Sequence, residues 1–393
     1  MKSFKTKSLA NLVFAFIFLF ASSVAYADQD HAEDSSDDAH GEHSHVEEGH
    51  ENEFNASEMI MHHIGDANEF HVIGNENTSI NFSVPLPVIL WDKAEGLKVM
   101  LSSAFHHGHT AVDGYVLDHG IVKKIVGDFP EGHVEVEVHH GEVIYDGHHY
   151  TTEGKSSLLA STSFFDFSIT KNVFSMFLSM LILFIIFISM ARFYKKGNQV
   201  PTGIYNALEP FIIYVRDEIA IDNIGKKKAG KFLPLLLTIF FFIWINNLLG
   251  LVPFFPGSAN LTGNIAFTFV LSVIVMLVVN LNGTKDYWGH MLWMPGIPTP
   301  MKLLMAPIEL VGIIKPFSLL VRLFANITAG HILILSLVSL IFIFNNIGMS
   351  AMSIPFMLFI NALELLVAFL QAYIFTLLTA LFIGMAVAEH EHH

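Results

Sequence analysis

No cysteine occurs in this chain, so neither a disulfide bond nor thiolate chemistry can contribute to its fold or function. Charged side chains are also scarce, at 15% of the 393 residues, against about 25% in an ordinary soluble protein. From Phe232 to Thr284 there is no Lys, Arg, Asp or Glu, and 52% of the whole chain is hydrophobic. These deficits exclude an ordinary soluble protein and indicate a chain that lies largely in lipid.

The charges that are present are unevenly distributed. The first 149 residues carry 25 acidic and 7 basic side chains, a net charge of −18, whereas residues 150–393 carry 11 acidic and 14 basic ones, a net charge of +3. Seventeen of the 22 histidines also lie in the first 149 residues. This asymmetry predicts an aqueous amino-terminal part followed by a lipid-embedded part.

The first 27 residues have the pattern of a secretory signal peptide. Three lysines precede the short apolar run LVFAFIFLFA, and Ala25-Tyr26-Ala27 is a small-x-small cleavage site. A retained anchor is the alternative, but the apolar run is short for a membrane span. We therefore expect cleavage after Ala27, which leaves the acidic front outside the cytoplasmic membrane.

Residues 28–53 hold 11 acidic side chains and 5 histidines, with almost nothing apolar. Such a segment cannot bury enough surface to offset the entropy of ordering, so we expect it to be disordered. Imidazoles and carboxylates suit divalent metal ions, but they show no fixed ligand spacing here. A solvated tail is therefore the better interpretation.

Residues 54–160 are expected to form a small β-rich domain outside the cytoplasm, after a short amphipathic helix at 54–65. From about residue 71 to residue 152, segments such as VEVEVHHGEVIYDG alternate with period two and are bounded by Gly, Asp and Pro. No catalytic constellation occurs among them. The paired histidines are expected on the surface rather than as metal ligands.

Residues 161–393 are expected to form an all-α membrane domain. The first span is predicted at Asn172–Ala191, and the basic residues at 192–196 place its end in the cytoplasm. Residues 200–225 mix apolar and charged side chains, which is typical of a helix lying in the membrane interface. The lysines at 226–231 keep this segment on the cytoplasmic side.

The rest of the chain predicts four further membrane-inserted helices, five in all. The charge-free run divides at 253–264 into two spans joined by a hairpin on the outer side. The chain re-enters near Leu303 and is helical to about Phe344, a turn follows at 345–350, and a last helix runs from about Pro355 to Ala388. The last two helices are longer than about 20 residues, so we expect them to tilt or bend.

Arg322 is a lone arginine inside the apolar segment PFSLLVRLFANITAGHILILSLVSLIFIF. From Leu323 onward, His331 is the only ionisable side chain before Glu364. A charge at the bilayer centre costs roughly 2.5–3.5 kcal/mol, and a guanidinium does not escape this cost by losing its proton. An arginine that snorkels from a helix end is the alternative, but function is the default interpretation: a partner, a wet cavity or an ion path.

Polar side chains of the last two helices match in depth. With a rise of about 1.5 Å per residue, His331 lies roughly 13 Å outward of Arg322, and Glu364 lies roughly 10 Å outward of Gln371. Arg322 thus matches Gln371 near the middle of the membrane, and His331 matches Glu364 nearer the outside. The amide can orient the arginine without neutralising it, and the imidazole and carboxyl can take and release protons near neutral pH.

Helix rotation complicates these two matches. Nine residues place His331 on nearly the opposite helix face from Arg322, whereas Glu364 and Gln371 share a face. Either the helices cross and curve, or Arg322 faces another subunit while His331 faces an internal water path. Because no second carboxylate lies at the depth of the arginine in this chain, we expect a partner to supply one intermittently.

Three segments resemble subunit a of the F-type ATP synthases. KPFSLLVRLFANITAGHILI (315–334) resembles its arginine segment, ELLVAFLQAYIFTLLTALFIGMAV (364–387) its last helix, and FFIWINNLLGLVPFFPGSANLTGNIAFT (241–268) its earlier hairpin. The resemblance covers about residues 160–393. In front of it, HHIGDANEFHVI and PLPVILW resemble the amino-terminal extension of that subunit in Bacteroidetes-type bacteria.

The resemblance implies a proton-translocating stator subunit of the cell inner membrane, with a periplasmic amino-terminal domain and a cytoplasmic carboxyl terminus. The subunit would provide two offset half-channels beside a rotating ring of c subunits, and Arg322 would meet the membrane carboxylate of each c subunit in turn. The implied proton path comprises His331, Glu364, Gln371, Asn326, Asn246 and Asn247, with Glu309 in the cytoplasmic half. The implied partners are the c ring, the b stalk, lipid and protons, without nucleic acid, cofactor or metal, and the chain alone would not be catalytic.

Two other functions compete with this interpretation. A secondary ion-coupled transporter would show two similar halves with broken helices around a midplane site, and no such internal repeat is present. A metal-uptake protein that uses the histidine-rich front would need ligands in its spans, where only His331, Glu364 and Glu309 are available.

Overall fold

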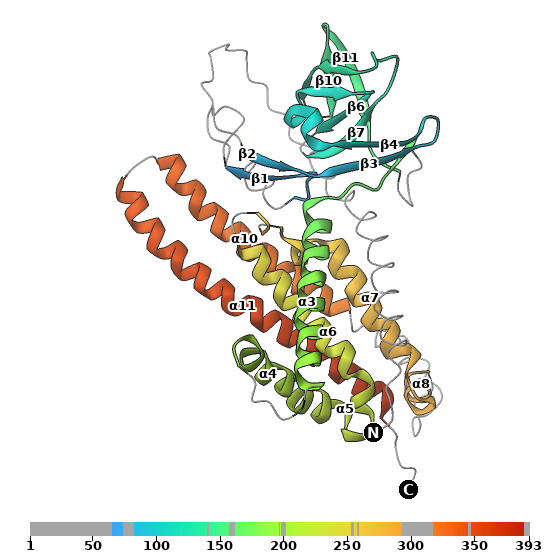
Figure 1. The fold of residues 1–393 in the computed structure, drawn as a ribbon, viewed down its shortest axis with the longest axis vertical. Helices are drawn as coiled ribbons and strands as arrows, with labels where there is room; N and C mark the ends of the chain where they lie inside the picture. The colour runs from blue at the N-terminus through green and yellow to red at the C-terminus, as the bar shows by residue number, and fades with distance from the viewer. Residues whose placement is uncertain are drawn as a thin grey trace, which may run out of the picture. The chain divides into compact units, whose positions relative to one another are not determined.

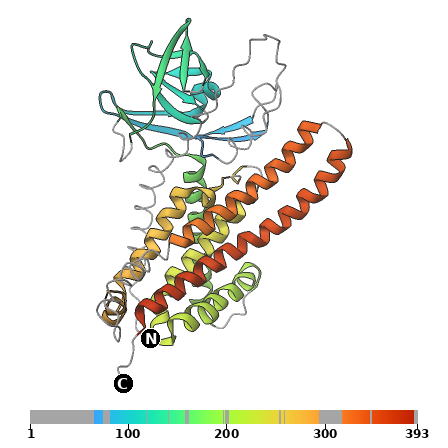
Figure 2. The same ribbon diagram turned by 180° about the vertical axis from the view of Figure 1, so that it is seen from behind.

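The computed structural model describes residues 65–73, 82–118, 120–139, 141–156, 162–195, 197, 202–252, 255–257, 259–292, 317–344 and 347–388. The expected signal peptide, the acidic segment 28–53 and the helix expected at 54–65 lie outside these residues. The chain forms two compact units (Figures 1 and 2). One comprises residues 22–171 and 329–363, and the other is built mainly of residues 172–328 and 364–393.

The described residues between Glu69 and Asp166 form β-structure, as the alternating pattern predicts, and all of its strand pairs are antiparallel. The elements are β1 (Glu69–Ile73), β2 (Phe82–Pro85), β3 (Pro87–Asp92), β4 (Gly96–Leu101), η1 (Ser102–Gly108), β5 (Thr110–Val112), β6 (Tyr115–Asp118), β7 (Ile121–Ile125), β8 (His133–Glu135), β9 (Glu137–His139), β10 (Glu142–Tyr145), β11 (His148–Glu153) and β12 (Phe164–Asp166). They make a two-stranded sheet β1-β2, a seven-stranded sheet β8-β5-β6-β7-β11-β10-β9 and a three-stranded sheet β12-β3-β4. Because β12 pairs with β3, the β-structure continues past the expected boundary at residue 160.

Two hairpins turn at Asp-Gly pairs, whose chemistry explains where the strands reverse. Asp113 and Gly114 have φ values of 49° and 79°, and Asp146 and Gly147 have 49° and 76°. Positive φ at both central residues defines the tight turn whose twist matches antiparallel strands, and Asp followed by Gly adopts it at little cost. Local sequence therefore determines the β5–β6 and β10–β11 connections.

Strand β6 is buried on both of its faces and joins two hydrophobic clusters. The first cluster comprises Val88, Leu90, Phe105, Val112, Tyr115, Leu117, Val122 and Phe164, and the second comprises Ala111, Val116, Ile125, Val136 and Val143. The first cluster packs the three-stranded sheet against the seven-stranded one. Only one face of the three-stranded sheet is used in this way, because Val88, Leu90 and Phe164 all point into that cluster.

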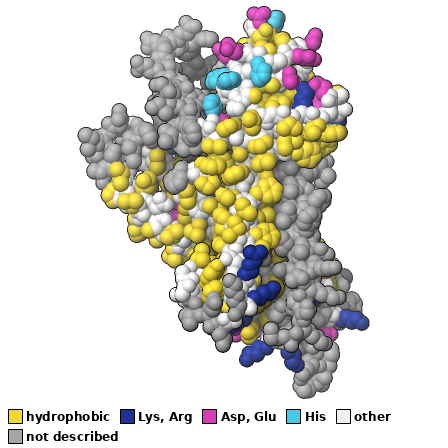
Figure 3. Space-filling model, in the orientation of Figure 1, with side chains coloured by type: hydrophobic (Ala, Val, Ile, Leu, Met, Phe, Trp, Pro, Cys, Tyr) yellow, Lys and Arg dark blue, Asp and Glu magenta, His cyan; other side chains and the backbone are white. Residues whose placement is uncertain are grey.

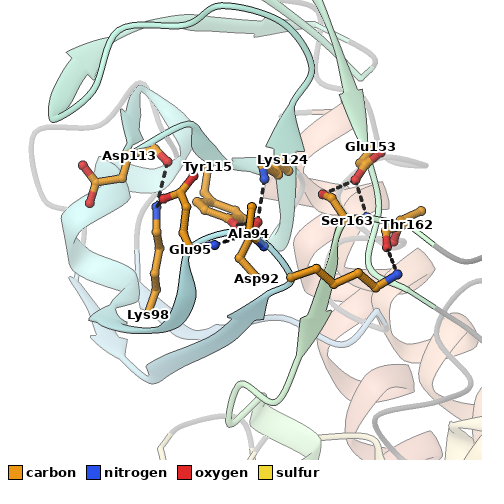
Figure 4. Close-up of polar contacts among 11 residues, drawn as sticks. Asp92, Ala94, Glu95, Lys98, Asp113, Tyr115, Lys124, Glu153, Thr162 and Ser163 are labelled. Carbon is orange, nitrogen blue, oxygen red and sulfur yellow. Dashed lines mark hydrogen bonds and ion pairs between the residues drawn. The ribbon is translucent and has the colours of Figure 1, made fainter.

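A buried carboxylate links β3 to β6 and β7 (Figure 4). Asp92 accepts hydrogen bonds from the Tyr115 hydroxyl at 2.6 Å and the Lys124 ammonium at 2.5 Å, and from the backbone N–H groups of Ala94 and Glu95. Burial alone would raise the pKa of the Asp92 carboxyl, but the ammonium, hydroxyl and N–H donors hold it well below its usual range. Burial, together with the hydrogen bond to the Asp92 carboxylate, raises the pKa of the Tyr115 hydroxyl.

The remaining described elements are helical. They are α3 (Lys171–Lys195), α4 (Ile204–Tyr214), η2 (Val215–Ile221, a π-helix), α5 (Asp222–Ile224), α6 (Lys226–Leu251), η3 (Leu261–Gly263), α7 (Ile265–Leu281), α8 (Lys285–Leu292), α10 (Phe317–Phe344) and α11 (Ile347–Val387). Among the described residues, α3, α6, α10 and α11 contain apolar stretches long enough to cross a membrane, and α7 is a shorter apolar helix. This agrees with the five predicted membrane-inserted helices. Figures 1 and 2 show α10 and α11 running alongside each other in opposite directions.

The predicted start of the last helix was wrong. Helix α11 begins at Ile347, so residues 347–350, expected in the turn, are helical, and Pro355 lies inside the helix. Proline is common at the first position of a helix, where its missing N–H is harmless. In membrane helices an internal proline is tolerated, since the freed backbone group finds other partners. The first span is also longer than the predicted Asn172–Ala191, because α3 extends to Lys195.

Aromatic side chains dock the interfacial segment onto the helices. Phe211 of α4 lies 4.8 Å from Trp244 of α6 and 5.7 Å from Phe369 of α11, measured between ring centroids. Trp244 and Phe369 are themselves 5.6 Å apart. The three rings therefore join α4 and α6 to α11, which lies far along the chain from both.

Candidate functional site

Arg322 lies on the side of α10 that faces away from the packed helices. Residues Leu319, Leu320, Leu323 and Ile327 are buried, whereas Arg322, Ala325, Asn326 and Ala329 form an exposed stripe at helical spacing. Among the described residues, no hydrogen bond or ion pair of the Arg322 guanidinium is recorded. The chain thus presents a permanent cation and an amide on the uncovered face of a membrane-length helix.

The depth of Arg322 follows from a contact at the α6–α7 connection. The Thr328 hydroxyl donates to the Gly263 carbonyl of η3 at 3.4 Å, so Thr328 lies level with that connection. Arg322 precedes Thr328 by six residues, or about 9 Å along the helix. The backbone of Arg322 therefore lies well inside the apolar part of the bundle.

The depth of Gln371 follows from α6. Asn247, about 6 Å from the end of α6 at Leu251, donates to the Ala368 carbonyl of α11 at 3.0 Å. Gln371 lies one turn deeper than Ala368, or roughly 10 Å from the same end of the bundle. Gln371 is buried and Arg322 is exposed, and no hydrogen bond between them is recorded among the described residues. Their depths are similar, while a direct contact stays a prediction.

Glu364 is a buried carboxyl group of α11. It is 6% exposed, and its Oε2 atom has no hydrogen-bond partner among the described residues. A buried carboxyl with a free oxygen is costly unless water or a proton satisfies it. It lies about one turn from Ala368, near the α6–α7 connection.

The neighbouring residues Asn246 and Asn247 behave differently. Asn247 donates to Ala368 and accepts from the Thr262 hydroxyl at 2.7 Å, so both ends of its amide join separate elements. Asn246 bonds only the Phe242 carbonyl of its own helix, at 2.7 Å, and its buried Oδ1 has no partner among the described residues. Asn247 therefore fastens the bundle, while Asn246 retains an unused acceptor.

His331 is half-buried on α10, nine residues beyond Arg322 and therefore on nearly the opposite helix face. Its pairing with Glu364 stays a prediction. Glu309 lies outside the described residues. Among the residues that the structure does describe, no three His, Asp or Glu side chains are grouped as a metal site would require.

Sequence reasoning missed three buried hydroxyl groups of the helical part. Ser175 of α3 and Ser272 of α7 are fully buried, and their Oγ atoms have no partner among the described residues. Thr262 is also buried and donates to Asn247. These residues could have been found in the sequence as hydroxyl side chains within uncharged spans. The predicted site included only ionisable and amide groups. A second missed signal is Asn264, whose side chain accepts from Ala266 N–H and so caps α7.

Comparison with known proteins gives two family matches. A family model described as ATP synthase A chain matches residues 173–384. A second model, described as a domain of unknown function (DUF8433), matches residues 59–155. The first match covers the helices that carry Arg322, Glu364 and Gln371, and the second covers most of the β-structure.

Several curated relatives are similar over more than half of this chain. ATP synthase subunit a of Chloroherpeton thalassium is 44% identical over 264 residues, which are 65% of this chain and 77% of the relative. ATP synthase subunit a 2 of Prosthecochloris aestuarii is 38% identical over 311 residues, 76% of this chain and 87% of the relative. ATP synthase subunit a of Myxococcus xanthus is 42% identical over 238 residues, 58% of this chain and 76% of the relative.

Proposed function

Because this chain belongs to the ATP synthase A chain family, and so to the membrane sector of the F-type ATP synthase, we propose that it is the stator that passes protons to a rotating ring of c subunits. The observation that carries the proposal is Arg322, a cation on the exposed face of a membrane-length helix. Lipid does not solvate such a charge, so a protein partner with an anion must cover it.

A c subunit with one membrane carboxylate is the partner that fits. A guanidinium offers a planar fork of donors that matches a carboxylate, and it stabilises the ionised form of each one as it passes. The same fixed charge repels a proton, so it prevents a continuous proton wire across the membrane. Protons then cross only by riding on the ring from one half-channel to the other.

The buried polar groups support an outer half-channel that ends near the depth of Arg322. Glu364 and Asn246 each have a buried oxygen without a partner among the described residues, as expected of groups that contact water in a path. Gln371 lies at the arginine's depth, and Asn247 holds the wall of the path by joining α6 to α11. We place His331 and Asn326 in the same half-channel and Glu309 in the cytoplasmic one.

The proposed orientation has the amino-terminal β-structure in the periplasm and the carboxyl terminus in the cytoplasm. Its support is the distribution of lysine and arginine, which cluster at 192–196 and 226–231, at the ends of α3 and α6 that would face the cytoplasm. The b stalk of the complex would reach the chain from the same side.

The test replaces Arg322 in the assembled complex. Arg322→Ala should abolish ATP synthesis and ATP-driven proton pumping, because no cation then meets the c-ring carboxylate. Arg322→Lys should also fail largely, since an ammonium lacks the planar fork and loses its proton more readily when desolvated. Both activities are measured in membrane vesicles, with a quinacrine-type dye reporting acidification.

Val321→Ala is the matched control, because Val321 is a neighbouring exposed residue of the same helix without a charge. It should pump normally. Passive proton flux should rise in the Arg322→Ala vesicles, because the barrier between the half-channels is gone. Near-normal ATP-driven pumping by the assembled Arg322→Ala complex would contradict the proposal.

A further inference from the structure

The outer face of the sheet β12-β3-β4, which we call the apolar sheet face, is hydrophobic although it faces away from the core. Its exposed members are Trp91, Leu97, Val99, Leu101, Phe165 and Phe167, with exposed fractions between 39% and 64%. The alternate residues Val88, Leu90 and Phe164 fill the core behind them. An antiparallel sheet with one solvated face normally carries polar side chains on that face. Both faces of this sheet are apolar instead.

Strand register makes the apolar sheet face continuous. Trp91 lies opposite Leu97 on β4 and opposite Phe165 on β12, so three exposed apolar side chains stand side by side across the sheet. Figure 3 shows hydrophobic side chains gathered over the β3–β4 hairpin. Six half-exposed side chains of this size present on the order of 500 Å², near the upper end for one patch on a soluble monomer. None of the six carries a charge, although the first 149 residues have a net charge of −18.

The chain itself holds this face close to a membrane. Only residues 167–170 separate β12 from α3, the first membrane-length helix. The backbone N–H groups of Phe167, Ile169 and Lys171 donate to the carbonyls of Ile89, Pro87 and Ala67 at 2.8, 3.0 and 2.9 Å. The connection is therefore held to the sheet by backbone hydrogen bonds and is not a flexible linker. Four extended residues span about 13 Å, so the carboxyl end of β12 lies within that distance of the first residue of α3.

We propose that the apolar sheet face lies against the lipid surface at the amino-terminal end of α3. Tryptophan is enriched at the boundary between headgroups and acyl chains, and Trp, Phe and Leu make up the apolar faces of segments that lie in this boundary. Lys93 lies beside the face, with its ammonium 5.5 Å from the centroid of the Phe165 ring and donating to the Thr162 carbonyl at 2.6 Å. An ammonium has three donors, so it can also bind a lipid phosphate. A stable protein interface buries about 800 Å² on each partner, which is more than this face offers. Lipid needs no such minimum, because α3 already anchors the chain.

The test uses cysteine-specific labels on the assembled ATP synthase, since this chain has no cysteine of its own. Val99→Cys places a bimane fluorophore on the apolar sheet face. Val126→Cys is the matched control, because Val126 is also an exposed valine and lies just after β7, away from that face. The labelled complexes are reconstituted into phosphatidylcholine–phosphatidylglycerol vesicles, with labelling of the unmodified complex as background. Quenching by a nitroxide on the lipid acyl chain and by aqueous iodide is then compared.

The label at position 99 should be quenched several-fold more by the lipid nitroxide than the label at position 126, and several-fold less by iodide. Equal iodide quenching at both positions, with no lipid quenching at position 99, would show a free face and overturn the proposal. Protection of position 99 from both quenchers would also overturn it, because a protein would then cover the face. Where Val99→Cys fails to assemble, Leu101→Cys on the same face gives the same readout.

Discussion

Asn247 should hold the membrane helices together, and its neighbour provides the comparison that tests this. The Asn247 amide joins α6 to the Ala368 carbonyl of α11 at 3.0 Å and to the Thr262 hydroxyl at 2.7 Å. Asn247→Ala removes both bonds. Hydrogen bonds between membrane helices contribute about 0.6 kcal/mol on average and up to about 1.7 kcal/mol. The two bonds together predict a loss of roughly 1–3 kcal/mol in the free energy of unfolding.

Asn246→Ala deletes the same atoms one residue earlier. Asn246 makes only a bond within its own helix, to Phe242, and its buried Oδ1 has no partner among the described residues. Removing that unpartnered oxygen offsets the loss of the local bond. Both variants also leave a small cavity of similar size. The difference between their free energies of unfolding therefore measures the hydrogen bonds that join α6 to other elements. We expect Asn247→Ala to be less stable than Asn246→Ala by roughly 1–3 kcal/mol.

The measurement is unfolding of the purified chain in mixed detergent micelles by titration with dodecyl sulfate, followed by circular dichroism. Thr262→Val completes a double-mutant cycle. Its effect should couple to Asn247→Ala by about 0.6–1.7 kcal/mol, because the two share one bond, and it should add simply to Asn246→Ala. Equal losses for the two alanine variants, or additive effects of Thr262→Val with both, would refute the assignment of Asn247 as the fastening residue.

Two further predictions concern packing and pH. A Cβ atom on Gly384 would overlap the Asn223 carbonyl oxygen, so Gly384→Ala should destabilise the chain by about 1–3 kcal/mol; Gly230→Ala, with nothing within 4 Å, should be harmless by the same unfolding assay. The raised pKa of Tyr115 means that its contribution to stability is complete below about pH 10 and is lost as pH rises above that value. Protease resistance of the β-structure in the intact complex should therefore fall above about pH 10, and Tyr115→Phe should remove this step and cost about 1.5–3 kcal/mol through the lost bond to Asp92. An unchanged unfolding midpoint for Gly384→Ala, or an unaltered alkaline step in Tyr115→Phe, would contradict these expectations.

Several features could be derived from the sequence because they depend on local chemistry. The uncharged run from Phe232 to Thr284 predicted two spans and a hairpin, and α6, η3 and α7 occupy those places. The transfer cost of a charge in lipid singled out Arg322 without any structure. Period-two alternation bounded by Gly, Asp and Pro predicted strands and turns, because strand period and turn conformation are properties of neighbouring residues. The start of α11 was mistaken because the same local rules do not account for a proline inside a membrane helix.

Other features were decided only by tertiary structure. Asn246 and Asn247 are neighbouring residues of the same type. Asn247 joins α6 to α11, whereas Asn246 has an oxygen without a partner among the described residues. The partner of Asn247 lies 121 residues away, so no local pattern specifies it. The same holds for the outward direction of Arg322 and for the apolar sheet face, where the register of β3, β4 and β12 gathers residues from distant segments. Local sequence determines which segments can lie in lipid or form strands and turns. The direction in which a side chain points, and what it contacts, depends on how whole elements pack.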